Sequence, residues 1–373
     1  MKKGWQTKKL SEICEIERGG SPRPIDSFLT NDPNGINWIK IGDTKNVAKY
    51  ITKTEEKIRP EGAKRSRLVY EGDFILSNSM SFGRPYIMKT TGCIHDGWLV
   101  LRKPKVNQDY LYHVLGSDLV FSQFDRLAAG STVRNLNIGL VKTVEIPFPP
   151  LPEQQRIVGI LEKAFAGIAT ARANSEKNLQ NARALFESHL QSVFTQRGDG
   201  WSSRAFEDCI EDVKYTTKIQ RKDFLEAGKY PIVSQEAEFT NGYWNNEEDV
   251  FKVRRPVVIF GDHTKVLKYV DFDFVLGADG VKILPPKQFL IPKYFFYHLR
   301  SVPLKSLGYS RHYRLLRELE ISYPHRVEQN AIAEKLDELD AETQRLESLY
   351  QRKLDTLEEL KKSLLHQAFS GRF

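Results

Sequence analysis

The strongest constraint on this sequence is a long internal repeat. Residues 153–197 align without a gap onto residues 328–372. A constant offset over such a stretch indicates duplication, because chance similarity between two helices would not keep one register so long. Identities occur at both ends of the alignment: Glu153 with Glu328, Gln154 with Gln329, Ile157 with Ile332, Leu161 with Leu336, Leu185 with Leu360, Phe194 with Phe369, and Arg197 with Arg372.

Both copies carry the apolar spacing of long helices. In the second copy the spacing alternates between three and four residues, which is the heptad pattern of a coiled-coil seam. Neither helix can bury its stripe alone, so we expect an antiparallel intramolecular pair; a coiled coil that serves oligomerisation is the alternative. The predicted core of the pair is Ile157, Leu161, Phe165, Ile168, Ile332, Leu336, Leu339, Leu346, Tyr350 and Leu357.

The repeat predicts a chain of four parts. Globular segments at 1–150 and 197–325 are each followed by a helix, at 151–196 and 326–373. Gly4-Trp5 recurs as Gly200-Trp201, but the middles of the two globular segments cannot be aligned by eye. Short apolar runs separated by Gly, Asp and Asn turns indicate strands. We therefore predict an α+β fold, with two globular domains joined by antiparallel helices and related by a pseudo-two-fold axis.

Charge suggests a polyanionic partner. The chain has a net charge of +8, and residues 1–150 alone carry 23 Lys and Arg against 16 Asp and Glu. A basic globular segment is typical of nucleic-acid binding. No apolar run could span a bilayer and no signal peptide is evident, so we expect a cytoplasmic protein. The three cysteines form no CxxC pair and are interpreted as buried apolar residues.

Motifs for catalysis are missing from the sequence. There is no phosphate-binding loop, no HExxH and no motif for amino methylation. One set of residues, Asp43 with Glu55, Glu56 and Lys57, has the residue types of a metal-dependent nuclease. It has no counterpart in the second copy, and we interpret it as a charged turn. We expect no catalytic residue and no metal site in this chain.

Polar loops supply candidate DNA contacts. Reading a sequence requires cations for phosphates and polar side chains that reach base edges. Any one such residue is more often a solvated loop residue. Asp262 and Asp279 are interpreted as turn or cap residues, although a carboxylate can accept from a cytosine amino group. The candidates are Asn78, Ser79, Arg84, Ser131, Thr132, Arg134 and Asn135 in the first globular segment, and His263, Thr264, Lys265, Lys268, Arg311, His312 and Arg314 in the second.

These features together resemble the specificity subunit of type I restriction-modification systems, over essentially the whole chain. The resemblance rests on GWQTKKLSEICEI, WIKIGDTK, GSTVRNLN, IPFPPLPEQQRI, VVIFGDHTKVLKYVDFDFVLGADGVKIL and LLHQAFSGRF. The sequence departs from the pattern at ISYPHRVEQN, which lacks the fuller proline run of the first copy.

The resemblance implies a non-catalytic subunit that reads double-stranded DNA. Each globular segment would be a target-recognition domain for one half of a bipartite site, and the helices would set the unread gap. Two methylation subunits and two restriction and translocation subunits would dock on it, with S-adenosylmethionine, ATP and Mg²⁺ on those partners. The alternatives are a coiled-coil scaffold whose basic domains bind protein or RNA, and a self-contained nuclease.

Overall fold

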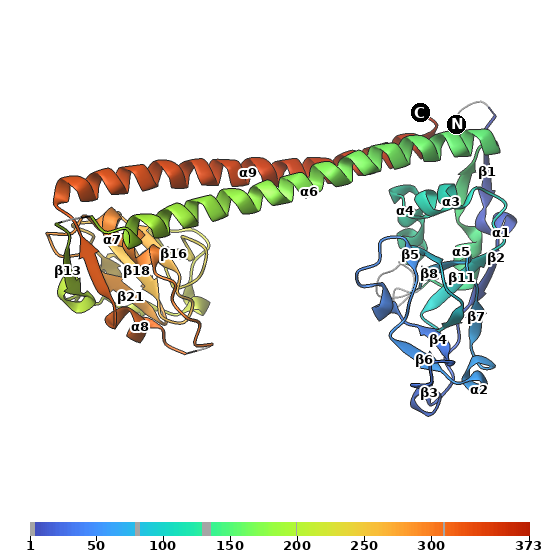
Figure 1. The fold of residues 1–373 in the computed structure, drawn as a ribbon, viewed down its shortest axis with the longest axis horizontal. Coiled ribbons are helices and arrows are strands. Elements are labelled where there is room, and N and C mark those ends of the chain that lie inside the picture. The colour runs from blue at the N-terminus through green and yellow to red at the C-terminus, as the bar shows by residue number, and fades with distance from the viewer. Residues whose placement is uncertain (1–3, 79–82, 129–135, 199, 309) are drawn as a thin grey trace. The chain divides into compact units, whose positions relative to one another are not determined.

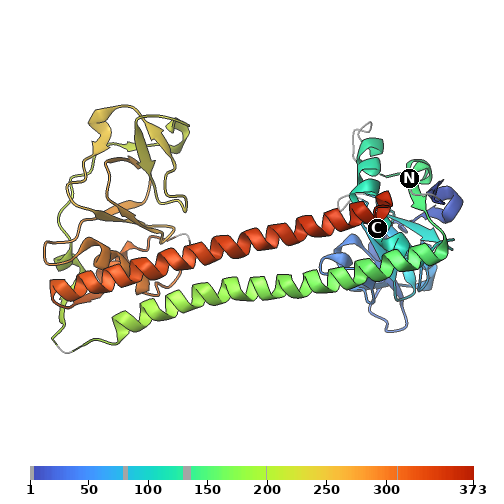
Figure 2. The same ribbon diagram turned by 90° about the horizontal axis from the view of Figure 1, so that it is seen from above.

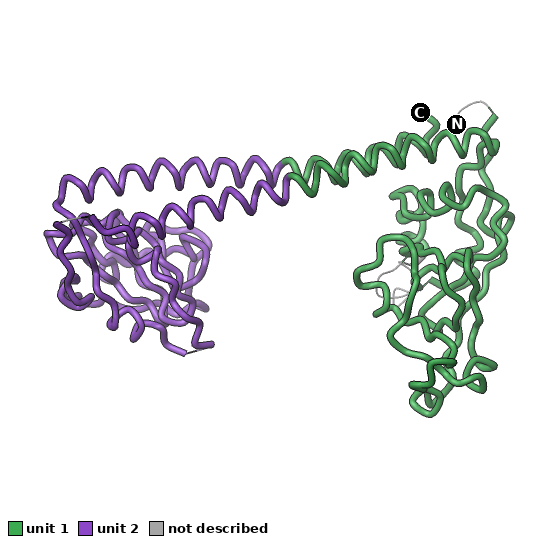
Figure 3. Tube along the Cα trace, viewed as in Figure 1, with its two compact units in different colours: residues 1–174, 353–373 green, residues 175–352 purple. Residues whose placement is uncertain are grey.

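The computed structural model of the chain describes residues 4–78, 83–128, 136–198, 200–308 and 310–373 (Figure 1). Two compact units make up the chain (Figure 3). Unit 1 comprises residues 1–174 and 353–373, and unit 2 comprises residues 175–352. Each unit contains strands together with segments of the same two long helices. We call the strand-containing parts module 1 (residues 4–148) and module 2 (residues 200–323).

Module 1 contains three sheets. One pairs β1 with β12, and two five-stranded sheets follow the orders β3-β6-β4-β10-β7 and β2-β11-β8-β9-β5. The strands are β1 (Gln6–Lys9), β2 (Glu15–Arg18), β3 (Leu29–Thr30), β4 (Ile36–Ile39), β5 (Tyr50–Ile51), β6 (Glu56–Ile58), β7 (Arg67–Val69), β8 (Phe74–Ser77), β9 (Pro85–Met88), β10 (Gly92–Ile94), β11 (Trp98–Arg102) and β12 (Glu145–Phe148). The helices are α1 (Leu10–Ile13), η1 (Ile25–Ser27), η2 (Ile41–Thr44), α2 (Pro60–Ala63), α3 (Gln108–Leu115), α4 (Asp118–Ala128) and α5 (Ile138–Thr143).

The sheet that contains β8 and β11 is covered on both faces. Alternate residues of a strand point to opposite faces. Phe74 and Leu76 accordingly join a core with Tyr110 of α3, whereas Ile75 joins a second core with Ile39 of β4. Burial on both faces explains why β8 and β11 are apolar at nearly every position.

Module 2 repeats this layering with a smaller set of strands. One sheet pairs β13 with β22, another has the order β14-β20-β15-β16 with β17 beside β20, and a third has the order β19-β18-β21. The strands are β13 (Ser202–Ala205), β14 (Lys218–Ile219), β15 (Tyr230–Val233), β16 (Gly242–Trp244), β17 (Val250–Phe251), β18 (Val257–Gly261), β19 (Leu267–Val270), β20 (Phe274–Gly277), β21 (Val281–Leu284) and β22 (Glu320–Tyr323). The helices are η3 (Phe206–Cys209), η4 (Arg221–Asp223), η5 (Glu247–Asp249), α7 (Pro292–Ser301) and α8 (Tyr313–Arg317). The predicted α+β class is confirmed.

Two long helices, α6 (Leu151–Thr195) and α9 (Arg326–Ser370), follow the modules. They run antiparallel within each unit (Figure 2). In unit 1, Lys361 lies over the Phe165 ring and Arg172 pairs with Glu358 at 3.6 Å, so residue numbers rise along α6 as they fall along α9. In unit 2, Arg183 of α6 pairs with Glu347 of α9 at 2.9 Å.

The predicted core positions of the helix pair are buried to different degrees. Ile157, Leu161 and Leu336 are completely buried. They owe this to the modules, because the first two belong to the core of module 1 and Leu336 to the core of module 2. The half-buried positions are Phe165, Ile168, Ile332, Leu339, Leu346, Tyr350 and Leu357.

A buried glutamine fastens the start of each long helix to its module. Gln154 accepts a hydrogen bond from the Asn107 amide at 2.8 Å and donates one to the Pro149 carbonyl at 2.8 Å. Gln329 accepts from the Ile291 amide at 2.8 Å and donates to the carbonyls of Phe289 and Pro324.

A buried tyrosine also makes the same hydrogen bond in both modules. The Tyr110 hydroxyl donates to the Pro147 carbonyl of β12 at 3.0 Å, and the Tyr294 hydroxyl donates to the Ser322 carbonyl of β22 at 2.7 Å. Each tyrosine also packs against a phenylalanine from the end of the other long helix, Phe369 in unit 1 and Phe194 in unit 2. The duplication therefore extends from the helices into the modules.

Two simpler expectations concern the cysteines and membranes. Cys14, Cys93 and Cys209 are free and buried, as the sequence predicts, and burial raises the pKa of the Cys14 thiol to about 12. None of the helices in the described residues is long and apolar enough to cross a membrane.

Candidate nucleic-acid interface

Three segments of module 1 meet at the end of β8. The Asn78 amide donates to the Gly97 carbonyl at 3.0 Å, in the turn between β10 and β11. The Asn78 carbonyl accepts from the Leu136 amide at 2.9 Å, just before α5. We call this meeting point the module 1 junction. It joins the two polar loops that were predicted to contact DNA, those that contain residues 77–85 and 129–137.

Module 2 has the same junction at the end of β18. The Asp262 amide donates to the Gly280 carbonyl at 2.7 Å, and the Asp262 carbonyl accepts from the His312 amide at 2.7 Å. The strand registers agree with this equivalence. Ser77 pairs with Trp98 across β8 and β11, and Gly261 pairs with Val281 across β18 and β21.

The equivalence aligns the middles of the modules. It matches Asn78 with Asp262, the turn His95-Asp96-Gly97 with Ala278-Asp279-Gly280, and Leu136 with His312. The sequence did not reveal it, because backbone groups make these hydrogen bonds and the side chains differ. The Asp-Gly dipeptide before β11 and β21 was the one available signal.

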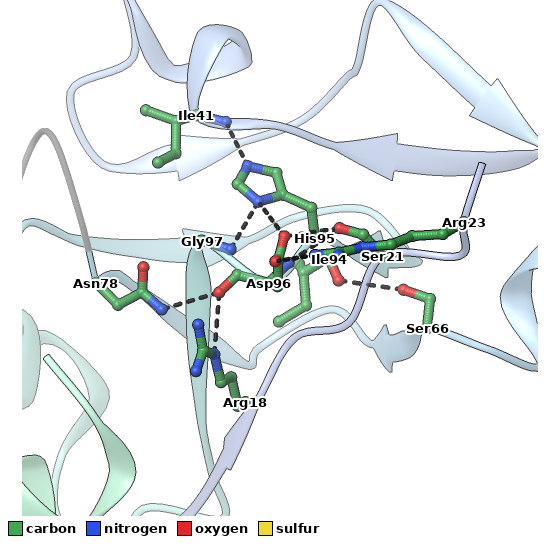
Figure 4. Close-up of polar contacts among 10 residues, drawn as sticks. All are labelled: Arg18, Ser21, Arg23, Ile41, Ser66, Asn78, Ile94, His95, Asp96 and Gly97. Carbon is green, nitrogen blue, oxygen red and sulfur yellow. Dashed lines mark hydrogen bonds and ion pairs between the residues drawn. The ribbon is translucent and has the colours of Figure 1, made fainter. Parts of the chain in front are cut away.

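The turn of the module 1 junction is held by polar side chains (Figure 4). The Asp96 carbonyl accepts from Arg18 Nε at 3.1 Å and from Asn78 Nδ2 at 2.9 Å. The Asp96 carboxylate accepts from the Ser21 hydroxyl at 2.7 Å and lies 3.6 Å from the exposed Arg23 guanidinium. The Ser21 hydrogen bond is the main reason that the pKa of Asp96 lies below its usual value, so this carboxylate is ionised at neutral pH.

His95 holds the same turn against η2. Its Nε2 accepts from the Ile41 amide at 3.2 Å, and its Nδ1 lies 2.7 Å from the Gly97 amide (Figure 4). Burial lowers the pKa of His95, so the ring is neutral at physiological pH. Its Nδ1 also lies 3.7 Å from the Asp96 carboxylate, so the ring joins η2 to the turn.

The predicted contacts of module 1 lie in several kinds of environment. Asn78 is buried, and its side chain serves the turn through Asp96. Arg84 is exposed; its guanidinium donates to the Val47 carbonyl at 3.2 Å and lies over the Tyr86 ring. Five predicted contacts lie outside the described residues: Ser79, Ser131, Thr132, Arg134 and Asn135.

In module 2 the turn after β18 carries three predicted contacts. The His263 amide donates to Gln235 Oε1 at 3.1 Å, and the Thr264 hydroxyl donates to the Gln235 carbonyl at 2.6 Å. Lys265 has a positive φ of 61° and its Nζ lies 3.4 Å from the Leu304 carbonyl. Thr264 is exposed, and the other two are half-buried.

The remaining contacts predicted for module 2 divide into exposed and buried residues. Arg311 and Arg314 are exposed beside the junction. His312 is buried, and its Nε2 accepts from the Leu307 amide at 3.0 Å. Lys268 is also buried; its ammonium group donates to the Glu238 carbonyl at 2.5 Å, and burial lowers its pKa to about 8. These partners give Lys268 and His312 a role inside the fold.

The residues considered for a nuclease site, Asp43, Glu56 and Lys57, make local hydrogen bonds and ion pairs. Asp43 accepts from the Lys40 amide at 2.7 Å and from the Glu55 amide at 3.0 Å. Glu56 pairs with Lys40 Nζ at 2.5 Å, and Lys57 Nζ donates to a backbone carbonyl. Within the described residues, no group of three or more His, Cys, Asp or Glu side chains could hold a metal ion.

Comparison with solved structures gives the class of this fold. A chain from a study of complex assembly and conformational transition of the type I R-M system superposes with a TM-score of 0.82, at 19% identity over 98% of both chains. The HsdS subunit from Thermoanaerobacter tengcongensis gives a TM-score of 0.61 at 20% identity, over 100% of this chain and 98% of that one. The fold is that of type I restriction-modification specificity subunits.

Sequence comparison gives the family. The model of the type I restriction modification DNA specificity domain matches residues 2–180 and 199–355, and the chain belongs to this family. The MjaIX type I restriction enzyme specificity subunit of Methanocaldococcus jannaschii is 24% identical over 86% of this chain and 81% of its own length. The EcoDI specificity subunit of Escherichia coli is 26% identical over 52% of this chain and 41% of its own length. The resemblance to this family is confirmed.

Proposed function

We propose that this chain reads a bipartite site in double-stranded DNA, one half with each module. The observation that carries the proposal is the repeated junction. Two modules share one set of backbone hydrogen bonds, yet present different side chains around it. Such a pair is suited to reading two different sequences with one construction, because base contacts specify sequence while the scaffold positions them.

Affinity would come from cations around each junction. Arg84 in module 1 and Arg311 and Arg314 in module 2 are exposed. Neutralising phosphates releases counterions, which makes binding strong at low salt and independent of sequence. The same surface would carry the polar residues that reach base edges. Lys265, half-buried in the turn after β18, is a further candidate for a phosphate contact.

Spacing between the half-sites would come from the long helices. Each has 45 residues, which corresponds to about 68 Å at 1.5 Å per residue. The buried Gln154 and Gln329 fix the helix starts to the modules, so a module could not turn freely about its own helix. We infer that helix length sets the number of unread base pairs.

Catalysis would belong to partner subunits. We propose that two methylation subunits and two restriction and translocation subunits dock on this chain in the cytoplasm, and that they carry S-adenosylmethionine, ATP and Mg²⁺. The local contacts made by Asp43 and Glu56 support a role for this chain in recognition alone.

Single-molecule long-read sequencing of adenine methylation would test this function. Cells would express the chain with its neighbouring methylation subunit, and a matched strain would lack this chain alone. We expect a methylated two-part motif with a fixed unread gap that disappears in the matched strain. If no such motif appears while the methylation subunit is active and bound, the interaction-scaffold alternative replaces the proposal.

A further inference from the structure

The two modules place an aspartate at the same point of the same junction. Asp96 precedes Gly97, whose carbonyl accepts from the end of β8, and Asp279 precedes Gly280, whose carbonyl accepts from the end of β18. Each aspartate therefore lies beside the meeting point of the loops that we propose face DNA. From the sequence alone, Asp279 was interpreted as a turn residue.

Contacts of the Asp279 carboxylate within the described residues do not explain why an aspartate occupies this position. Its side chain is exposed. Across the described residues, none donates a hydrogen bond to this carboxylate or forms an ion pair with it. The turn itself is held by other groups, since the Ala278 amide donates to the Ile219 carbonyl at 2.7 Å and the Gly280 carbonyl accepts from Asp262. An aspartate that only shaped a turn would hydrogen-bond its own backbone.

Asp96 has the equivalent position in module 1, but its carboxylate already has polar neighbours within the fold. Its side chain is 46% exposed. The Ser21 hydroxyl and the Arg23 guanidinium approach it from one segment, and His95 Nδ1 lies 3.7 Å away (Figure 4). An ionised carboxylate has about four lone-pair sites. Arg23 and His95 lie beyond hydrogen-bond distance, at 3.6 and 3.7 Å, so acceptor capacity remains beside the Ser21 hydrogen bond. The two modules thus differ in how much of the carboxylate is free.

A carboxylate on a DNA-facing surface has a restricted set of uses. Phosphates repel it, so it lowers affinity for every sequence unless a hydrogen bond from a base offsets this repulsion. In the major groove the donors available to a carboxylate are the exocyclic amino groups, and Asp pairs with the N4 amino group of cytosine. Guanine and thymine present acceptors at the corresponding positions and would be rejected.

We propose that Asp279 and Asp96 are specificity-determining residues that each accept a hydrogen bond from the amino group of one base, cytosine by preference, in the half-site read by their module. The proposal rests on the proposed function, because it requires that the junctions face DNA. It assigns one position of each half-site to a named carboxylate.

The test uses the full chain co-purified with its methylation subunit and a library of duplexes randomised over both half-sites. Selection and sequencing would compare wild type with Asp279→Asn and Asp279→Ala, each checked for an unchanged melting curve. Asp271→Asn is the matched control, because Asp271 is exposed in the same module but precedes β20, whereas Asp279 follows it. All three variants remove one negative charge.

For both Asp279 variants we expect the preference for an amino-bearing base to fall by about fivefold or more at one position of one half-site. The other half-site should be unchanged, and binding to non-specific duplex should strengthen because a repelled charge is gone. Asp96→Asn should relax one position of the opposite half-site. Asp271→Asn should change no position.

The failure of this inference can be told from the failure of the proposed function. A wild-type library without a two-part motif would overturn the function. A clear two-part motif that survives both Asp279 variants at every position would overturn the role of Asp279 and leave the function standing. Relaxation spread evenly over both half-sites would also count against it, since a single carboxylate can contact only one module's DNA.

Discussion

Replacing Gln154 by alanine should loosen the attachment of α6 to module 1. The side chain is buried and serves two backbone groups, the Asn107 amide and the Pro149 carbonyl, both at 2.8 Å. A buried backbone group left without a partner costs about 1 to 3 kcal/mol. We therefore expect the free energy of unfolding of unit 1 to fall by about 2 to 4 kcal/mol, with partial relief where water enters.

Gln155→Ala is the matched control, because Gln155 is the neighbouring residue of the same helix and is exposed. Hydrogen exchange followed by mass spectrometry would measure peptides that cover the start of α3 and the start of α6. Exchange should accelerate in both peptides for Gln154→Ala and in neither for Gln155→Ala. The Asn107 amide is a direct reporter, since it loses its acceptor.

A second measurement ties this attachment to function. If module orientation depends on Gln154, the methylated motif of Gln154→Ala should tolerate a wider range of unread gaps, while both half-site sequences stay the same. Equal exchange in the two variants would refute the attachment. Faster exchange with an unchanged gap would show that Gln154 stabilises the unit without contributing to spacing.

Other predictions follow from the helices, the loops and the buried histidines. Removing one turn from α6 shortens it by about 6 Å, close to two base pairs, so methylome sequencing should show an altered gap; an unchanged gap would exclude the helices as the spacer. Lys265→Ala should weaken binding to every sequence and flatten its salt dependence in titrations between low and physiological salt, whereas a change confined to one base position would assign Lys265 to readout. Burial lowers the pKa of His113 and His298 to about 4, below the value of about 6.5 in the unfolded chain, so the unfolded state binds the proton first. The contribution of the two neutral histidines to the free energy of unfolding should be complete above about pH 6.5. Towards pH 4 it should fall by about 1.4 kcal/mol per pH unit for each histidine. Urea unfolding measured across this range should show a shallower dependence on pH for His298→Gln.

The long helices could be predicted from the sequence because their determinants are local. Apolar spacing and the proline-rich stretch before α6 act over a few residues, and both are visible in the printed chain. The degree of burial could not be predicted in the same way. Ile157 and Leu336 are buried because module residues cover them, and this depends on contacts with residues far away in the chain.

For the same reason, residue type alone did not indicate which of the candidate contacts are exposed. Asn78, Lys268 and His312 have side chains suited to DNA, but the structure buries all three and gives their polar atoms partners within the fold. Arg311 and Arg314, chosen by the same criterion, are exposed. A polar residue in a loop can serve the loop or its ligand, and only tertiary contacts distinguish the two.

The repeat shows a division between bonds made by side chains and bonds made by the backbone. At the attachment of each module to its long helix a side chain makes the bond, and the residue is the same in both copies, as with Gln154 and Gln329 or Tyr110 and Tyr294. Where the backbone makes it, the side chain differs, as with Leu136 and His312.

Glycine is the exception that supports this division. Gly97 and Gly280 occupy the same point of the junction, where a Cβ atom would lie 2.2 Å from the His95 ring in one module and 2.7 Å from Gln235 in the other. The junction therefore constrains the glycine and the direction of the backbone, and leaves most neighbouring side chains free to vary. A module built in this way can acquire a new set of base contacts without losing the hydrogen bonds that hold its loops, and the buried glutamine and tyrosine keep it attached to the same helix while it does so.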